Sequence, residues 1–151
     1  MKKIKILRII ARLNIGGPAI HAILLTQELS RDKFNSLLIT GSIAPNEGDM
    51  GYYAKEKGVE PISIPELRRE FNLINDTLAF IKIYKIIMAE QPDIIHLNST
   101  KAGILGGLAA MPYRIFGKNI LTIFTAHGWV FKESHSKTVN LFFKILTCLS
   151  L

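Results

Sequence analysis

The sequence predicts an α/β fold in which helices cover both faces of a parallel sheet. Short apolar runs alternate along the whole chain with segments of helical length and periodicity. Glycine and proline stand where several of these runs end. Hydrophobic residues make up 48% of the 151 residues and charged residues 21%, which is typical of one packed domain. We therefore expect a single domain over residues 1–151.

Three strands and two helices are expected in the N-terminal half. The strands are the apolar runs KIKILRIIA, NSLLITG and VEPISI, at residues 3–11, 35–41 and 59–64. Pro18 suits the first turn of a helix, where its missing N–H costs nothing, and this helix should end near residue 30. A short helix over residues 50–57 should stop at Gly58, because glycine readily ends helices.

A long helix is expected after the charged loop at residues 65–76. Asp76 is predicted to cap it, and Pro92 should stop it near Glu90. Its apolar stripe should contain Leu78, Ile81, Tyr84, Ile87 and Met88.

The C-terminal part should contain two strands, DIIHLN and NILTIFTA, on either side of a helix at residues 99–114. A loop at residues 127–137 and a final helix from about residue 138 should follow. This alternation favours a Rossmann-like sheet with the strand order 3-2-1-4-5 and right-handed crossovers.

The composition narrows the classes of partner. A formal net charge of +7 suits anionic partners such as nucleotide diphosphates, an anionic membrane surface or nucleic acid. Nucleic acid is not expected, because no DNA-reading motif or arginine–aromatic interleaving occurs. The lone Cys148 fits a reducing compartment, and residues 102–113 are too short an apolar stretch to span a bilayer. We expect a cytoplasmic protein; if it binds a membrane, we expect it to be peripheral on the inner face.

No metal site or cofactor is expected. The four histidines and the distant cysteine do not have the spacing of metal ligands.

Three unusual segments fall at the carboxyl ends of predicted strands, where open α/β sheets bind ligands. They are Gly16-Gly17-Pro18, His96-Leu97-Asn98-Ser99-Thr100 and Thr125-Ala126-His127-Gly128. If strand one neighbours strand four and strand four neighbours strand five, these segments line one crevice.

The glycine loop has two interpretations. Gly16 and Gly17 let a ligand approach the backbone closely, and the following helix directs free N–H groups to the same place, which suits a phosphate. The alternative is a tight strand-to-helix turn that binds nothing. The chain contains neither G-x-G-x-x-G nor G-x-x-x-x-G-K-[ST], so a dinucleotide fingerprint and a P-loop are not expected.

The histidines differ in context. His127 could bond a sugar hydroxyl or a phosphate, or carry a proton, and the alternative is a loop histidine bonded to nearby backbone. His96 lies in a buried-looking strand, which favours a core histidine over a ligand-binding one. His21, one turn into the first helix, either points back at the glycine loop or faces solvent.

The remaining candidates are polar residues near the same edge. Ser99 and Thr100 are typical helix caps, and Lys101 is either a solvated lysine or a charge for a phosphate. Arg69, beside Arg68 in the loop after the third strand, is either solvated or contacts an acceptor or lipid headgroup.

Four stretches carry a family resemblance: LNIGGPAIHAILLTQEL, LRREFNLINDTLAFIKIYKII, QPDIIHLNSTKAGILGGLAA and FTAHGWVF. In order and spacing they resemble the N-terminal domain of family 4 glycosyltransferases, which is one half of a GT-B fold. The resemblance covers nearly the whole chain. It implies a domain that holds the acceptor, while a second domain holds the nucleotide-sugar donor. It also implies retention of anomeric configuration without a metal.

The resemblance assigns roles to individual positions. It implies that Gly16 and Gly17 lie at the donor diphosphate, that His127 contacts the donor sugar, that Ser99 and Lys101 line the cleft, and that Arg69 lies on its acceptor side. From their places near the same predicted strand ends, we also expect Gly128 beside the diphosphate and His21, His96 and Thr100 along the acceptor side of the cleft.

Two positions depart from the family pattern. Ile20 stands where a polar residue is common, and Asn98 stands where a second histidine is common. The resemblance further suggests that the donor domain is absent and that the final helix is cut short, so that the chain alone is inactive. The alternatives are a non-catalytic α/β binding module and one subunit of a split two-chain transferase.

Overall fold

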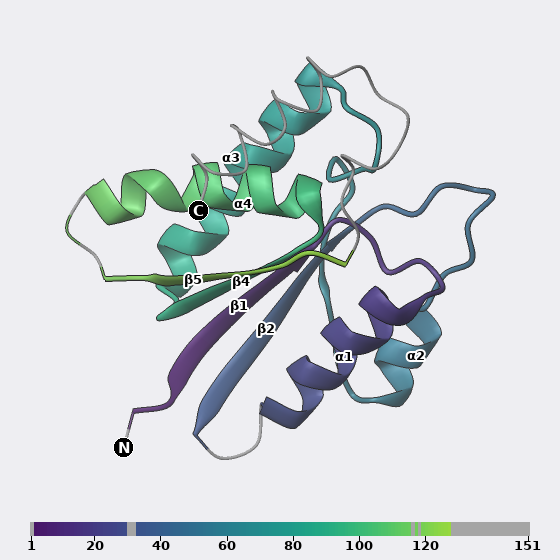
Figure 1. Cartoon of the computed structure of the whole chain (residues 1–151), viewed down its shortest axis with the longest axis horizontal. Helices are drawn as coiled ribbons and strands as arrows, with labels where there is room; N and C mark the ends of the chain where they lie inside the picture. The colour runs from purple at the N-terminus through teal and green to yellow at the C-terminus, as the bar shows by residue number, and fades with distance from the viewer. Residues whose placement is uncertain (1, 30–32, 116, 118, 128–151) are drawn as a thin grey trace.

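The computed structural model describes residues 2–29, 33–115, 117 and 119–127, which form a three-layer α/β domain (Figure 1). In these residues five strands lie in one parallel sheet in the order β3-β2-β1-β4-β5, which confirms the predicted strand order. The strands are β1 (Ile4–Ile10), β2 (Phe34–Gly41), β3 (Ile62–Ile64), β4 (Ile94–Asn98) and β5 (Leu121–Thr125). The helices are α1 (Gly17–Leu29), α2 (Gly51–Glu56), α3 (Leu73–Glu90) and α4 (Thr100–Ile115). The final helix expected from about residue 138 lies outside the described residues.

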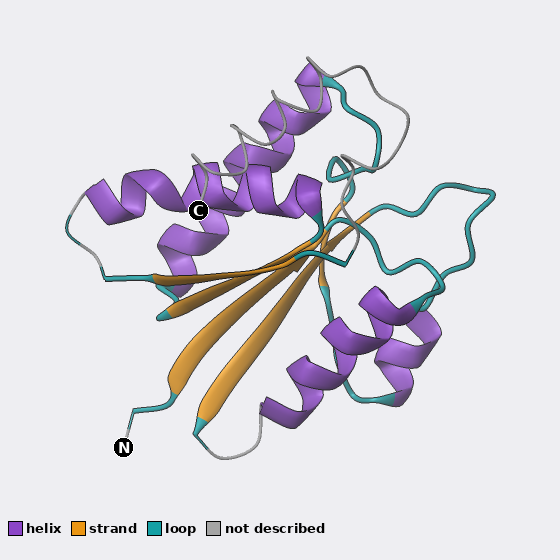
Figure 2. Ribbon diagram, in the orientation of Figure 1, coloured by secondary structure: helices purple, strands orange, loops and turns teal. Residues whose placement is uncertain are grey.

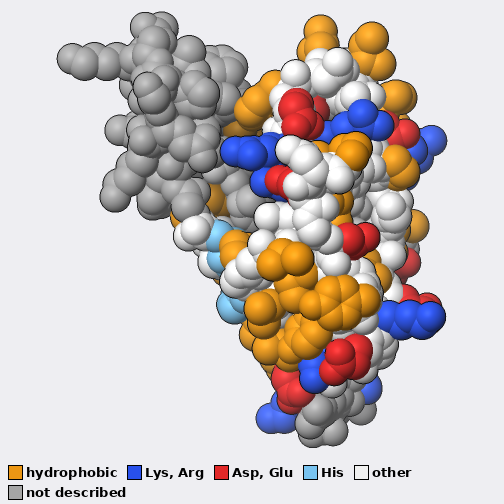
Figure 3. Space-filling view, turned by 90° about the vertical axis from the view of Figure 1, so that its right-hand side faces the viewer, with side chains coloured by type: hydrophobic (Ala, Val, Ile, Leu, Met, Phe, Trp, Pro, Cys, Tyr) orange, Lys and Arg blue, Asp and Glu red, His pale blue; other side chains and the backbone are white. Residues whose placement is uncertain are grey.

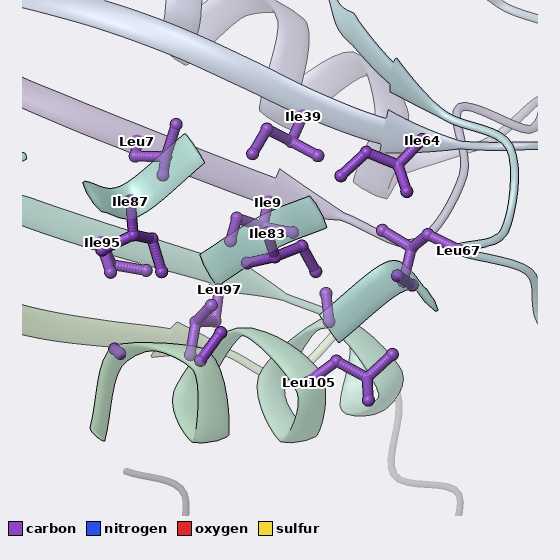
Figure 4. Packing of buried hydrophobic residues seen from close by; sticks show 14 of the residues in the cluster. Leu7, Ile9, Ile39, Ile64, Leu67, Ile83, Ile87, Ile95, Leu97 and Leu105 are labelled. Carbon is purple, nitrogen blue, oxygen red and sulfur yellow. The ribbon is translucent and has the colours of Figure 1, made fainter. Parts of the chain in front are cut away.

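Helices α1 and α2 cover one face of the sheet, and α3 and α4 cover the other (Figure 2). Because side chains alternate between the faces of a strand, β1 and β2 contribute to the apolar cores on both faces. Leu7, Ile9, Ile95 and Leu97 pack with α3 and α4 in the larger core (Figure 4). A second core, on the other face, joins the sheet to α1 and α2.

The start of α3 differs from the prediction. Asn72, not Asp76, is the N-cap, and its side-chain oxygen accepts a hydrogen bond from the Asn75 amide at 3.0 Å. Asp76 reaches back instead, and its Oδ2 accepts from the Asn72 amide at 3.2 Å. This reciprocal arrangement resembles a capping box, in which a residue of the first turn satisfies the amide of the cap. The predicted cap is therefore the second half of the capping pair.

The predicted apolar stripe of α3 was right at Ile87, which is buried, and at Tyr84, which packs against the core, but wrong at its other three residues. The buried residues are Ala79, Ile83 and Ile87, spaced four apart. Leu78 and Met88 are each 42% exposed, and Ile81 is 39% exposed. Ala79 is buried with Ile83 and Ile87 in the larger core, whereas the sequence pattern gave most weight to large residues.

The third strand is shorter than the predicted run at residues 59–64. Only Ile62–Ile64 pair with β2. Val59 is buried in the core beneath α1 and α2. Pro61 has no N–H to donate to a neighbouring strand, which fits a strand that begins after it.

Candidate functional site

The carboxyl ends of β1, β4 and β5 meet the first turn of α1 at one edge of the sheet (Figure 1). Three histidines gather here, from α1, from β4 and from the segment after β5. The ring centroid of His21 lies 5.3 Å from that of His127 and 6.3 Å from that of His96, both in edge-on contacts. Histidine side chains reach the molecular surface on the face shown in Figure 3. Residues predicted from three separate segments therefore lie together.

His96 is buried in β4, and both of its ring nitrogens are bonded. Arg8 Nε donates to His96 Nδ1 at 3.1 Å, so Nδ1 carries no proton. His96 Nε2 lies 2.8 Å from Thr125 Oγ1 and therefore donates to it. Burial, followed by the charge of Arg8, lowers the pKa of His96 to about 4. His96 is thus neutral near pH 7 and has no ring nitrogen left for a ligand, as expected of a core histidine.

Arg8 is the site residue that the sequence analysis missed. It is 1% exposed, and its Nη1 donates to Thr26 Oγ1 at 2.7 Å and to Ser36 Oγ at 3.0 Å. Burial lowers the pKa of Arg8 to about 10, which leaves the guanidinium charged near pH 7. The sequence signal for Arg8 was an arginine in the middle of a strand predicted to be buried. A buried charge needs polar partners, so such an arginine indicates a polar cluster around it.

Asn98 ends β4 on the same face of the sheet as His96. Its Nδ2 donates to the carbonyl oxygen of His96 at 3.3 Å, and its side chain is completely buried. Its Oδ1 lies 3.0 Å from His127 Nε2. Burial, followed by the nearby His21, lowers the pKa of His127. A neutral, half-buried His127 is suited to accept a hydrogen bond or a proton from a hydroxyl group.

The glycine loop lies directly before α1. Gly17 is the first residue of the helix, and a Cβ built on it would meet no atom within 4 Å. Gly16 has a φ of +156°, which glycine adopts without strain. The Ile15 amide donates to the Gly48 carbonyl at 3.1 Å, so the loop is held against the segment before α2. The open space in front of Gly17 is what close approach of a ligand to the backbone requires.

Ser99 joins β4 to α4 in an unusual conformation. Its φ is +82°, and its Oγ is buried without a hydrogen-bond partner among the described residues. Left-handed backbone is uncommon for a residue with a Cβ and often marks functional sites. Thr100, the first residue of α4, is buried as well.

Lys101 is not the solvated lysine that the sequence suggested. Its side chain is 6% exposed, and its Nζ lies 2.6 Å from Asp76 Oδ1. It also donates to the carbonyl of Glu70 and lies 4.9 Å from the ring centroid of Phe71. Lys101 therefore ties α4 to the start of α3.

Arg69 lines an open pocket of about 420 Å³ beside the strand ends. The pocket lies between the loop after β2 and the loop after β3. The loop after β3 packs tightly there, since a Cβ on Gly41 would lie 1.6 Å from the carbonyl oxygen of Leu67. Charged and hydroxyl side chains dominate the lining: Arg12, Ser42, Glu47, Arg68, Arg69 and Glu70. Arg12 is paired with Glu47 at 2.9 Å, whereas Arg69 is exposed.

The described residues contain neither a candidate metal site nor a helix that could span a membrane. No group of three His, Cys, Asp or Glu side chains there could hold a metal ion. None of the helices in the same part of the chain is long and apolar enough to cross a membrane. Gly128, expected beside the donor diphosphate, lies outside the described residues.

Comparison with solved structures shows the same fold. A protein from Listeria monocytogenes assigned as a UDP-N-acetylglucosamine 2-epimerase matches with a TM-score of 0.68 and 19% identity, over 99% of this chain and 38% of that one. The UDP-GlcNAc 2-epimerase of Neisseria meningitidis, solved with UDP-GlcNAc, matches with a TM-score of 0.58 and 11% identity, over 99% of this chain and 39% of that one.

Comparison of sequences shows the family. UDP-Gal:α-D-GlcNAc-diphosphoundecaprenol α-1,3-galactosyltransferase of Escherichia coli is 35% identical over 114 residues, which cover 69% of this chain and 28% of that protein. The chain thus spans less than a third of this curated relative. The model of Glycosyltransferase Family 4 matches residues 15–147. The chain belongs to glycosyltransferase family 4.

Proposed function

We propose that this chain is the acceptor-side domain of a retaining hexosyltransferase that uses a nucleotide-sugar donor and a saccharide or lipid-linked acceptor. The observation that carries the proposal is the meeting of the glycine loop, Asn98 and His127 at the carboxyl edge of the sheet of a family 4 chain. The E. coli relative is named for transfer from UDP-Gal to a diphosphoundecaprenol-linked sugar. That name supports a lipid-linked acceptor here.

His127 is the residue proposed to contact the reacting sugar. Its lowered pKa keeps the imidazole neutral near pH 7, so that it can accept a hydrogen bond from a sugar hydroxyl. Gly16 and Gly17 are proposed to face the donor diphosphate, because a side chain at Gly17 would fill space that is now open. Gly128 follows His127 in the chain and is proposed to share that role.

The arginine-lined pocket is proposed to hold the anionic part of the acceptor. Its volume of about 420 Å³ lies within the range typical of ligand sites, roughly 300–1,000 Å³. Arg69 is exposed there and suits a diphosphate, because the guanidinium group pairs with phosphate oxygens in a bidentate way. A chain with a net charge of +7 is also suited to approach an anionic membrane surface peripherally.

Transfer is proposed to need a donor-binding domain in addition to these residues. We expect the 151-residue chain alone to transfer no galactose from UDP-Gal to the relative's acceptor. Turnover by the purified chain would contradict this part of the proposal.

Binding tests the acceptor site directly. A water-soluble, short-chain analogue of GlcNAc-diphosphoprenol should bind the chain, and Arg69→Gln should weaken binding about tenfold, since hydrogen bonds to charged groups contribute roughly 1.5–3 kcal/mol. Lys33→Gln is the matched control: it removes the same charge from an exposed residue beside the start of β2, at the opposite edge of the sheet. Equal affinities for the two variants, measured by calorimetry, would exclude the arginine pocket.

A further inference from the structure

The orientation of the Asn98 side-chain amide is fixed by its surroundings. Its nitrogen lies 3.3 Å from the carbonyl oxygen of His96, and only the nitrogen can donate to that oxygen. Rotation of the amide by 180° would bring two oxygens together. The amide is completely buried, so water cannot replace the lost hydrogen bond.

The fixed amide determines which nitrogen of His127 carries the proton. Asn98 Oδ1 has no hydrogen, and it lies 3.0 Å from His127 Nε2. Nε2 must therefore be the donor. In the neutral imidazole the other nitrogen, Nδ1, then has the unshared electron pair and acts as an acceptor.

The support of Asn98 is itself rigid. Asn98 lies between Ile10 of β1 and Thr125 of β5 in the sheet register. His96, whose carbonyl oxygen accepts from that amide, lies between Arg8 of β1 and Ile123 of β5 in the same register. The amide is therefore held by the paired ends of three strands.

We propose that Asn98 is a positioning residue that keeps His127 protonated on Nε2, so that His127 Nδ1 accepts a hydrogen bond from a sugar hydroxyl. This inference rests on the proposed function of His127. It also assigns a ligand chemistry to each part of the site. A ring nitrogen that can only accept a hydrogen bond binds a hydroxyl group, which donates one. It does not bind an ionised phosphate oxygen, so the hydrogen-bond donors to the phosphate must be other groups.

The tautomer can be observed without any transferase reaction. Long-range ¹H–¹⁵N NMR correlations of the 151-residue chain, with ¹⁵N-labelled histidine, distinguish protonated from unprotonated ring nitrogens. At a pH where His127 is neutral, we expect a single form that is protonated on Nε2. A form protonated on Nδ1, or a mixture of both, would overturn the proposal even before any variant is made.

Two variants then separate positioning from simple packing. Asn98→Asp keeps an acceptor oxygen and should keep the Nε2-protonated form, while the new carboxylate should raise the pKa of His127. Asn98→Leu removes the acceptor and should release His127 into a mixture of tautomers. An unchanged single tautomer in folded Asn98→Leu would show that another group fixes the ring.

Thr125→Val is the matched control. It removes the partner of His96 at the same edge of the sheet but leaves the Asn98 amide in place, so His127 should keep its single tautomer. If the tautomer behaves as expected while the acceptor analogue fails to bind, the positioning role stands and the proposed function fails. If the acceptor analogue binds but the tautomer does not behave as expected, the role of Asn98 is rejected and the proposed function stands.

Discussion

Arg8 shows how one buried side chain controls another at the scale of single residues. Its acceptors among the described residues are neutral: a histidine nitrogen and two hydroxyl oxygens. Its positive charge therefore disfavours a second charge on His96. Burial, together with this charge, keeps His96 neutral. Its hydrogen bonds fix one tautomer, and its carbonyl oxygen supports Asn98.

Replacing Arg8 should change the titration of His96. In Arg8→Met the pKa of His96 should rise from about 4, because a neighbouring positive charge that opposed protonation is gone. NMR titration of the histidine ring measures the change. Arg12→Met is the control, since Arg12 is paired with Glu47 and does not contact His96. A pKa of His96 that stays at the wild-type value would show that burial alone keeps the ring neutral.

Helix α3 illustrates what local hydrogen bonds contribute at the scale of an element. Asn72→Ala removes the oxygen that accepts from the Asn75 amide and should lower the free energy of unfolding by about 1 kcal/mol. Asn72→Asp keeps an acceptor and adds a negative charge at the helix N-terminus, so it should cost little or nothing. Urea denaturation of the two variants gives the comparison. Equal losses would mean that the cap does not stabilise α3.

The contact between α3 and α4 includes a buried ion pair in addition to apolar packing. Asp76→Asn keeps an oxygen that can accept from the Asn72 amide but leaves the buried Lys101 ammonium without its carboxylate. We expect a loss of about 3 kcal/mol, because an uncompensated buried charge is costly. Glu90→Gln, in the more exposed pair with Lys5, should cost less than about 1 kcal/mol. Thermal unfolding of both variants measures the difference, and similar losses would contradict the role of Lys101 in joining the helices.

The sequence allowed the elements and their order to be predicted, because strand and helix periodicities, glycine and proline mark them directly. It did not allow the phase of α3 to be predicted, since Leu78 and Met88 are as apolar as the residues that face the sheet. Nor did it reveal the partners of Lys101, which is paired with Asp76 from another helix. His127 and Asn98 were both noticed, but their contact depends on the pairing of β4 with β5. Arg8 could have been noticed as a charge within an apolar strand, but its partners Thr26, Ser36 and His96 come from other elements and could not be read from the strand itself.

At the scale of the whole molecule, the two faces of the sheet differ in the side chains that they carry. The face toward α3 and α4 carries the larger apolar core (Figure 4). The face toward α1 carries a polar row formed by Arg8, His96 and Asn98, which leads to His127 at the carboxyl edge. The residues that support the proposed site thus lie on the face opposite the larger apolar core, next to the smaller core that joins the sheet to α1 and α2.

The net charge of +7 predicts how acceptor binding should respond to salt. Exposed charges are screened over about 10 Å at 0.1 M salt and over about 3 Å at 1 M, so an exposed arginine should lose much of its attraction for a diphosphate as salt rises. The dissociation constant of the short-chain GlcNAc-diphosphoprenol analogue should therefore increase with salt. Arg69→Gln should flatten this dependence, whereas Lys33→Gln should change it less. An uncharged analogue without the diphosphate should bind equally at all salt concentrations. If the affinities of both analogues change alike with salt in calorimetric titrations, salt acts on the protein in general. The arginine pocket then does not recognise the diphosphate.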